Sequence, residues 1–246
     1  MATANTMAEY GLYLESGPRQ RKTMVHVLDL LGCIARGPTT EAALEATPDA
    51  IRAYLRFLRC HGEAVEPEGI FGTVVMEHVM EGPWLGEGNP AGGFGPDFSP
   101  LSAAEQRLYL QRLDWLRQDL LCLIGDLPLE QLAAEPEIRG RPIQHILEHI
   151  AESQYAYLRA IVGRVEGLPA ALRAVREGPA EVASALDQAW MLTKSRLEAV
   201  TESEREQLVQ RGQVTWTVRR ALRRMLEHEW EHLQETARRL GKDVGD

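Results

Sequence analysis

The sequence is poor in cysteine. Three cysteines occur among its 246 residues, at Cys33, Cys60 and Cys122, and no two of them form a Cys-x-x-Cys pair. An odd number of cysteines without paired spacing excludes a disulfide framework and a cysteine-based zinc knuckle.

Long apolar runs are also absent. No stretch approaches the roughly 18 to 20 consecutive apolar residues that a membrane helix needs. Residues 1–8 lack the basic and then apolar pattern of a signal peptide. We therefore expect a cytoplasmic protein that does not bind membranes.

The chain has no excess of positive charge. It carries 27 Lys and Arg against 36 Asp and Glu, which gives a formal net charge of −9 at pH 7. Nucleic acids and anionic lipid surfaces repel such a chain as a whole. One local exception is a stripe of arginines followed directly by glutamates: Arg219, Arg220, Arg223, Arg224, then Glu227, Glu229, Glu231 and Glu235. Because the acids follow directly, we expect no nucleic-acid partner.

The composition is that of a chain that folds. Hydrophobic residues make up 44% and charged residues 26%, which supplies a packed core and excludes global disorder. At roughly 150 residues per domain, the length fits one large or two small domains.

Residues 81–100 predict a linker between two domains. In this segment, EGPWLGEGNPAGGFGPDFSP, glycine and proline fill half of the positions and no helical or alternating periodicity survives. Its aromatic residues Trp84, Phe94 and Phe98 are expected either to anchor an ordered loop or to form the lid of a pocket. The sequence thus predicts a module at 1–80, a linker at 81–100 and a second domain at 101–246.

The first module is predicted to be α+β. Runs rich in β-branched and aromatic residues predict strands at 10–15, 23–30 and 70–80. Between the last two, residues 39–62 predict a helix with Thr39 or Thr40 as its N-cap. Pro48 is expected to kink this helix or to split it.

The second domain is predicted to be all-α. Helical periodicity follows a capping box at 102–105, continues after Pro142 to about Ile161, resumes near Pro179 and returns at 216–240. Four amphipathic helices of this length can bury their apolar stripes only against one another, which predicts an up-down four-helix bundle.

The chain has seven histidines: His26, His61, His78, His145, His149, His228 and His232. Their spacing separates the first three from the last four. The first three have no partner at ligand spacing, and we interpret them as ordinary surface or strand residues. His228 and His232 stand at i and i+4 on the last predicted helix, which places two imidazoles on one face, a turn apart.

Helical phase at about 100° per residue indicates where the last helix points these side chains. His228 and His232 lie on the flank of the apolar stripe and face a neighbouring helix. Glu229 falls inside the stripe, where a carboxylate needs a cationic or protonated partner. Glu227 and Glu231 are predicted to point outward into solvent.

His149 is the inward histidine of the second predicted helix. It lies in line with small residues at the margin of the apolar stripe, whereas His145 shares a charged outer face with Glu148 and Glu152. Ile-Leu-Glu-His at 146–149 is repeated as Met-Leu-Glu-His at 225–228. His149, His228 and His232 would hold a divalent ion with positions open to substrate. The alternative is three buried histidines hydrogen-bonded within an ordinary core.

Residues from about 101 to 242 resemble the DinB-like superfamily of metal-binding four-helix bundles. The matching segments are PIQHILEHIAES, with His149, and TWTVRRALRRMLEHEWEHL, with His228 and His232. The resemblance implies that these three histidines bind nickel, zinc or iron, and that the protein is a homodimer. The family includes S-transferases that use bacillithiol, mycothiol or glutathione, and a mycothiol-dependent maleylpyruvate isomerase. The chain departs from the family at Arg141, where an aromatic residue often precedes the second helix, while Trp216 keeps the equivalent place before the fourth.

The first 65 or so residues resemble the HicB-like antitoxin fold. The segment VLDLLGCIARGPTTEAALEATPDAIRAYL follows the strand, the Gly-Cys turn and the Gly-x-Thr helix start of that family, and the hairpin before it is shortened to ESGPRQRKT. The resemblance implies a module that binds a small ribonuclease toxin. Because no DNA-binding segment accompanies it here, we favour an accessory module or dimerisation surface over a working antitoxin.

Two functions remain open from the sequence. In the first, the ion held by His149, His228 and His232 binds a low-molecular-weight thiol and deprotonates its sulfur for attack on an electrophilic substrate. Glu229 then orients an imidazole or handles a proton, or it is the structural partner of an arginine. In the second, a HicB-like module recognises a protein partner, and the helical domain is a scaffold with a structural or vestigial metal.

Overall fold

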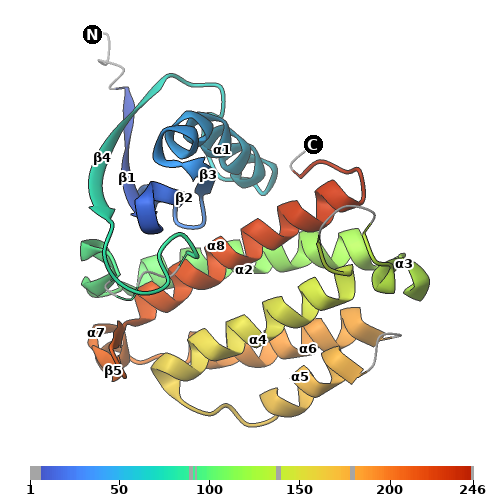
Figure 1. The fold of residues 1–246 in the computed structure, drawn as a ribbon. Helices are drawn as coiled ribbons and strands as arrows, with labels where there is room; N and C mark the ends of the chain where they lie inside the picture. The colour runs from blue at the N-terminus through green and yellow to red at the C-terminus, as the bar shows by residue number, and fades with distance from the viewer. Residues whose placement is uncertain (1–6, 89–90, 92, 137–139, 178–180, 245–246) are drawn as a thin grey trace. The chain divides into compact units, whose positions relative to one another are not determined.

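The chain divides into two units, each with its own core. The computed structural model describes residues 7–88, 91, 93–136, 140–177 and 181–244 (Figure 1). The described residues of Met1–Pro96 form one unit and Asp97–Val244 form the other. The boundary falls inside the Gly- and Pro-rich segment 81–100.

The first unit is built on a four-stranded sheet. Its strands are β1 (Ala8–Ser16), β2 (Arg21–Val27), β3 (Ile34–Thr39) and β4 (Phe71–Val79), in the order β3-β2-β1-β4. Short 3-10 turns at Pro18–Gln20 and Leu28–Leu30 follow β1 and β2. The strand pairs β1–β2 and β2–β3 are antiparallel, whereas β4 pairs parallel to β1 with a register shift between Leu12 and Tyr13. A parallel pair needs a crossover connection, and α1 (Thr40–Cys60) supplies most of it, lying against β2 and β3.

Helix α1 begins at Thr39, whose side-chain hydroxyl accepts a hydrogen bond from the Ala42 N–H at 3.2 Å. The helix continues through Pro48, so the expectation that Pro48 splits it is wrong. Ala43 and Thr47 before the proline and Ile51 after it are buried on the same side. Packing on both sides of Pro48 therefore outweighs the missing N–H.

The predicted strands coincide with β1, β2 and β4, and the sequence does not predict β3. Its residues, IARGPT, include Gly37 and Pro38, which weaken the strand signal. Of the aromatic residues in 81–100, Phe94 is fully buried against Tyr13 and His26, with ring centroids 5.6 and 5.0 Å away. Trp84, in contrast, is exposed.

The second unit contains four long helices that contact one another in pairs. These are α2 (Ala103–Ile124), α4 (Ile143–Val162), α6 (Val182–Glu198) and α8 (Val218–Arg239). Helices α2 and α4 each pack against both α6 and α8 (Figure 1). The predicted capping box forms at Ser102 and Glu105, and Thr217 caps α8. Leucine and isoleucine side chains from all four helices fill the interior, among them Leu116, Leu120, Ile150, Leu186, Leu222 and Leu226.

The second unit is not entirely helical, so that expectation is wrong. Strands β5 (Val209–Arg211) and β6 (Val214–Trp216) pair as an antiparallel hairpin whose turn contains Gly212 at φ 60°. Short helices α3 (Leu129–Ala133), α5 (Leu168–Glu177) and α7 (Glu202–Glu206) connect the long ones, and a 3-10 turn spans Gly95–Phe98. The expected helix start near Pro179 lies outside the described residues. In the described part of the chain, no helix combines the length and apolar character that crossing a membrane requires.

Candidate metal centre

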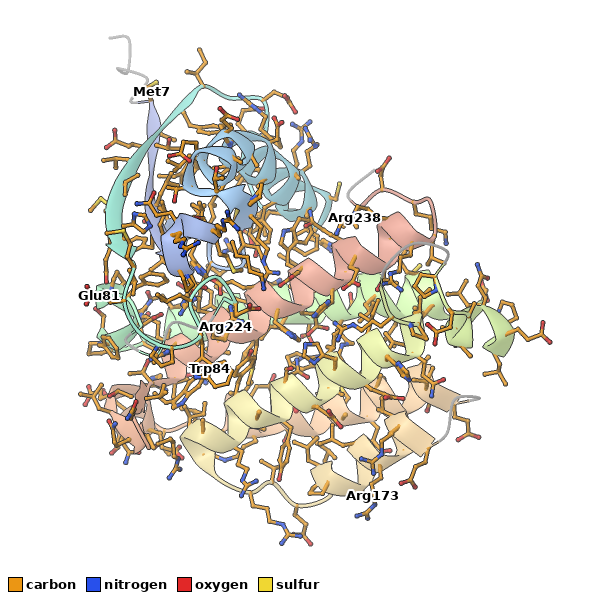
Figure 2. All side chains as sticks on the ribbon, viewed as in Figure 1. Met7, Glu81, Trp84, Arg173, Arg224 and Arg238 are labelled. Carbon is orange, nitrogen blue, oxygen red and sulfur yellow. The ribbon has the colours of Figure 1, made fainter. Side chains whose placement is uncertain are left out.

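Helix α8 is charged in sequence but mostly buried in the structure. The Arg223 guanidinium donates to both carboxylate oxygens of Asp97, at 2.7 and 2.9 Å. Arg223 and Arg224 both donate to Glu227 Oε2, at 2.8 and 2.7 Å. Figure 2 labels Arg224 on α8. Glu227 is 1% exposed, so the prediction that it points into solvent is wrong. Helices α2 and α4 both pack against α8 and bury these groups. The buried charges of α8 are therefore neutralised by ion pairs inside the protein.

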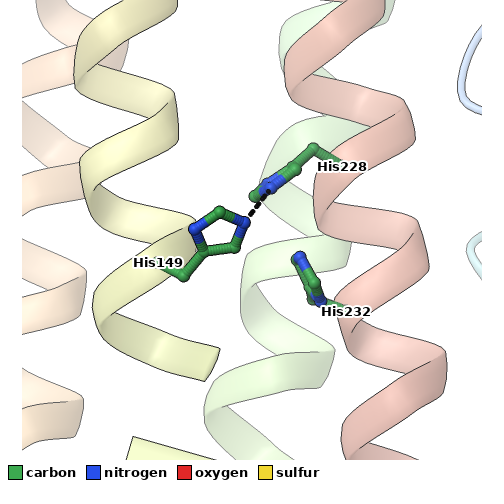
Figure 3. Close-up of side chains that lie close together, drawn as sticks. All are labelled: His149, His228 and His232. Carbon is green, nitrogen blue, oxygen red and sulfur yellow. Dashed lines mark hydrogen bonds between the residues drawn. The ribbon is translucent and has the colours of Figure 1, made fainter. Parts of the chain in front are cut away.

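The three candidate ligands meet between α4 and α8. His149 comes from α4, and His228 and His232 come from successive turns of α8; each offers a nitrogen, and these nitrogens lie within 4.8 Å of one another. The Nε2 atoms of His149 and His228 are 2.9 Å apart, and the rings face one another across the gap between the two helices (Figure 3). His145, the other histidine of α4, is exposed. The structure thus brings together the three histidines that helical phase selects.

Burial keeps two of these imidazoles neutral. The pKa of His149 is lowered to about 4, mainly by partial burial and to a smaller extent by the nearby Arg141 and His232. Burial is also the main reason why the pKa of His228 lies well below its ordinary value of 6.5, with the electrostatic interaction with His232 next in size. Both rings are therefore uncharged at neutral pH, which leaves ring lone pairs able to coordinate a cation.

A carboxylate orients the third imidazole. His232 Nδ1 lies 2.8 Å from Glu235 Oε2, and this hydrogen bond is the main reason why the pKa of Glu235 is lowered. An ionised carboxylate can only accept, so Nδ1 carries the proton and the Nε2 lone pair remains for a ligand. The sequence analysis missed Glu235 in this role, although its spacing of three residues from His232 on one helix is a usable signal.

Glu229 has a structural role. Its buried carboxylate accepts from Arg117 Nε at 2.6 Å and from Gln154 Nε2 at 3.1 Å. Arg117 also donates to the backbone oxygen of Leu186 at 2.9 Å. Of the roles open to Glu229 in the sequence, the structure gives it the arginine partnership, which links α8 to α2 and α4.

Arg141 stands at the edge of the triad. It precedes Pro142, the N-cap of α4, and its Nη2 lies 3.3 Å from His232 Nε2. The side chain is 34% exposed, and among the described residues its ion-pair partner is Glu235, with a carboxylate oxygen 3.9 Å away. Trp216, which precedes α8, packs its ring 5.8 Å from that of Tyr157. A cation therefore borders the triad at the position where the resemblance leads us to expect an aromatic ring.

The donor set fits a divalent transition metal. Three imidazoles suit zinc, nickel and iron alike, so they do not select one of them. Bonds of about 2.0–2.1 Å to nitrogen place the ligand atoms of one ion roughly 3–4 Å apart. The nitrogens of the triad lie within 4.8 Å, so small rotations of the rings bring them to that spacing.

A family model matches the helical unit. The model of the DinB superfamily matches residues 112–236, more than half of the chain and a span that includes His149, His228 and His232. No curated protein and no solved structure gives a significant match. The match does not reach residues 1–80, so their HicB-like character stays a prediction.

Proposed function

Because the chain belongs to the DinB superfamily, we propose that it is a divalent-metal-dependent enzyme of the thiol S-transferase type. Its substrates would be a low-molecular-weight thiol and an electrophilic small molecule. The convergence of three imidazoles, two of them held neutral by burial, is the observation that supports this proposal.

The framework of the proposed site is an up-down four-helix bundle. The pairwise packing of α2, α4, α6 and α8 supports that architecture, with α3, α5, α7 and the β5–β6 hairpin as additions to it. The bond from Arg117 to Glu229 and the bond from Gln154 to Glu229 hold α2, α4 and α8 in register. Fixed helices keep the imidazoles at a constant spacing, which a metal site requires.

The residues of the site have distinct tasks. His149 and His228 would bind the ion through the Nε2 atoms that face one another, and His232 through the Nε2 that Glu235 leaves unprotonated. A divalent ion supplies Lewis acidity there, which lowers the pKa of a thiol that binds it. The walls around His228 and His232, which are only 8% and 5% exposed, exclude water from that side.

The metal can be tested before the chemistry. Element analysis of the purified protein should find about one divalent ion per chain, and a His149→Ala, His228→Ala double variant should contain none. His145→Ala is the matched control, since it removes an exposed histidine from the same helix. A wild-type protein without a divalent ion would refute the proposal.

The thiol chemistry needs its own assay. Bacillithiol, mycothiol and glutathione are each offered with a model electrophile, and the conjugate is measured before and after removal of the metal. Activity with at least one thiol, lost on chelation and restored by the ion, is expected. A metal-bearing protein that conjugates none of them would point to another metal reaction, such as hydrolysis.

The first unit supports a second candidate function, that of a protein-interaction module. The Gly-Cys pair of the HicB-like motif forms a turn with Gly32 at φ 111°, and Thr39 of the same motif caps α1. At the edge of its sheet, β4 exposes Val74, Val75 and Met76. An edge strand with apolar side chains can pair with a strand of a second protein, including another copy of this chain. A pull-down that retrieves a small basic ribonuclease, unchanged by His228→Ala, would favour this candidate.

A further inference from the structure

Arg141 lies on the side of the triad that a bound metal ion would use. The guanidinium Nη2 lies 3.3 Å from His232 Nε2, the lone pair that a metal would use. A divalent ion at the three nitrogens and a guanidinium at this distance repel each other strongly in a partly buried site. An anion bound between the metal ion and the Arg141 guanidinium would offset this repulsion.

The carboxylate beside Arg141 is already shared. Glu235 lies 2.8 Å from His232 Nδ1 and accepts from Arg239 Nη2 at 3.1 Å, whereas it is 3.9 Å from Arg141. The other cation near the triad, Arg224, has a carboxylate at 2.7 Å in Glu227. Within the described residues, Arg141 is thus the cation beside the triad without a carboxylate at hydrogen-bonding distance.

The backbone around Arg141 is held in place. Arg239, from the last turn of α8, donates a hydrogen bond to the backbone oxygen of Arg141. Pro142, the next residue, is the N-cap of α4 and restricts the backbone that precedes it. The side chain, in contrast, is 34% exposed. A solute that enters from solvent can therefore reach a guanidinium whose origin is fixed relative to the three histidines.

We propose that Arg141 determines specificity at the metal centre by binding the carboxylate of a small anionic ligand that reaches the triad. A guanidinium binds a carboxylate through two parallel N–H groups, which fixes the orientation of the ligand as well as its charge. One guanidinium matches the single charge of a carboxylate, whereas a phosphate dianion calls for further donors. The inference rests on the proposed function, because in that function the ligand is a carboxylate-bearing thiol or its electrophilic partner.

The test compares matched ligands on cobalt-loaded protein. The visible spectrum of bound Co²⁺ is titrated with 3-mercaptopropionate, which has a carboxylate, and with 2-mercaptoethanol, which has none. Acetate and inorganic phosphate are titrated separately. The variants are Arg141→Met and Arg141→Lys, and Arg159→Met is the control because it removes an exposed arginine from α4, the helix that follows Arg141.

The wild type should bind 3-mercaptopropionate about tenfold more tightly than 2-mercaptoethanol. A gain in affinity of this size is expected from one charge-assisted contact between the carboxylate and Arg141. Arg141→Met should remove this preference, Arg141→Lys should retain part of it, and Arg159→Met should keep it whole. Equal binding of the two thiols by the wild type would overturn the inference, as would an equal loss in the Arg159 control. Tighter binding of phosphate than of acetate would overturn the choice of a carboxylate.

Failure of the proposed function gives different results. A protein that takes up no cobalt at the triad overturns both proposals. If cobalt binds and acetate perturbs its spectrum only when Arg141 is present, while neither thiol does, the thiol chemistry is refuted and the carboxylate site stands. If both thiols bind equally, the thiol chemistry stands and the role of Arg141 is refuted.

Discussion

The two units each bury histidine, but in opposite ways. In the first unit, His26 is fully buried on β2 and its Nε2 lies 3.4 Å from the carboxylate of Glu15, which also accepts from the Gly86 N–H at 3.1 Å. In the second unit, His149 Nε2 lies 2.9 Å from another imidazole nitrogen, the Nε2 of His228.

This difference separates a structural histidine from a candidate ligand. An imidazole whose nitrogen meets a carboxylate has a partner that stabilises it in the folded protein. When both neutral rings carry their proton on Nδ1, the two Nε2 atoms that lie at contact distance each present a lone pair, with no proton between them. A cation would coordinate both lone pairs. Histidine is therefore a structural residue in the first unit and a candidate metal ligand in the second.

The largest expected effect comes from breaking the buried charge pair between Arg117 and Glu229 in the second unit. Arg117→Met leaves Glu229 buried without its main partner, and we expect a loss of about 3–5 kcal/mol in the free energy of unfolding. Urea denaturation of the metal-free protein measures it. Adding Glu229→Leu should restore most of the loss, since the uncompensated charge is then gone. An unchanged denaturation midpoint in Arg117→Met would contradict this account.

The next effect separates the two kinds of histidine directly. His228→Ala should weaken metal binding on the order of 100-fold or more, because a ligand contributes at least as much as the groups that orient it. His26→Ala should leave the metal content unchanged and lower stability by about 1–3 kcal/mol, the cost of an unsatisfied buried group. Competition with a chelator of known affinity and urea denaturation measure the two quantities. The comparison fails if His26→Ala also reduces the metal content.

A smaller effect is expected at the carboxylate behind His232. Glu235→Gln removes the charge that holds the proton on Nδ1, and metal affinity should fall about tenfold. The same chelator competition measures it. Glu231→Gln, on the same helix, is the control, and a similar loss there would show that the net charge of α8 matters rather than the bond to His232.

A final effect is the dependence of stability on pH. The pKa of His149 is about 4 in the folded protein, below the ordinary value of 6.5, so the unfolded chain binds a proton that the folded chain does not in that interval. The metal-free protein should therefore keep its full stability above pH 6.5 and lose stability as the pH falls from 6.5 towards 4. His149→Gln should reduce this slope in urea denaturation measured at a series of pH values. Parallel slopes for variant and wild type would contradict the lowered pKa.

The sequence predicts the triad because each ligand lies on a regular helix. Phase along α4 separates inward His149 from exposed His145, and the spacing of His228 and His232 needs no knowledge of other elements. Caps at Thr39 and Ser102 are equally local signals. Ligand positions and helix caps that depend only on residues within a turn or so of one helix can thus be predicted from the sequence.

The errors concern residues whose surroundings come from distant parts of the chain. Glu227 is predicted to be solvated because the phase of one helix does not tell how many neighbouring elements cover it. In the structure Arg223 binds both Glu227 and Asp97, and Asp97 lies 126 residues earlier in the chain. The β5–β6 hairpin is missed because its strands have three residues each, too few for a periodic signal. The partners of Glu229 on α2 and α4 are likewise set by tertiary packing.

The separation of His149 and His228 along the chain, 79 residues, has a consequence for assembly. A nascent α8 offers an ion only the pair His228 and His232, and the third nitrogen arrives when α4 docks and a long loop closes. Tight binding of a cation would therefore indicate that α4 has packed against α8. A stopped-flow record of metal uptake during refolding would time the moment at which the two helices meet.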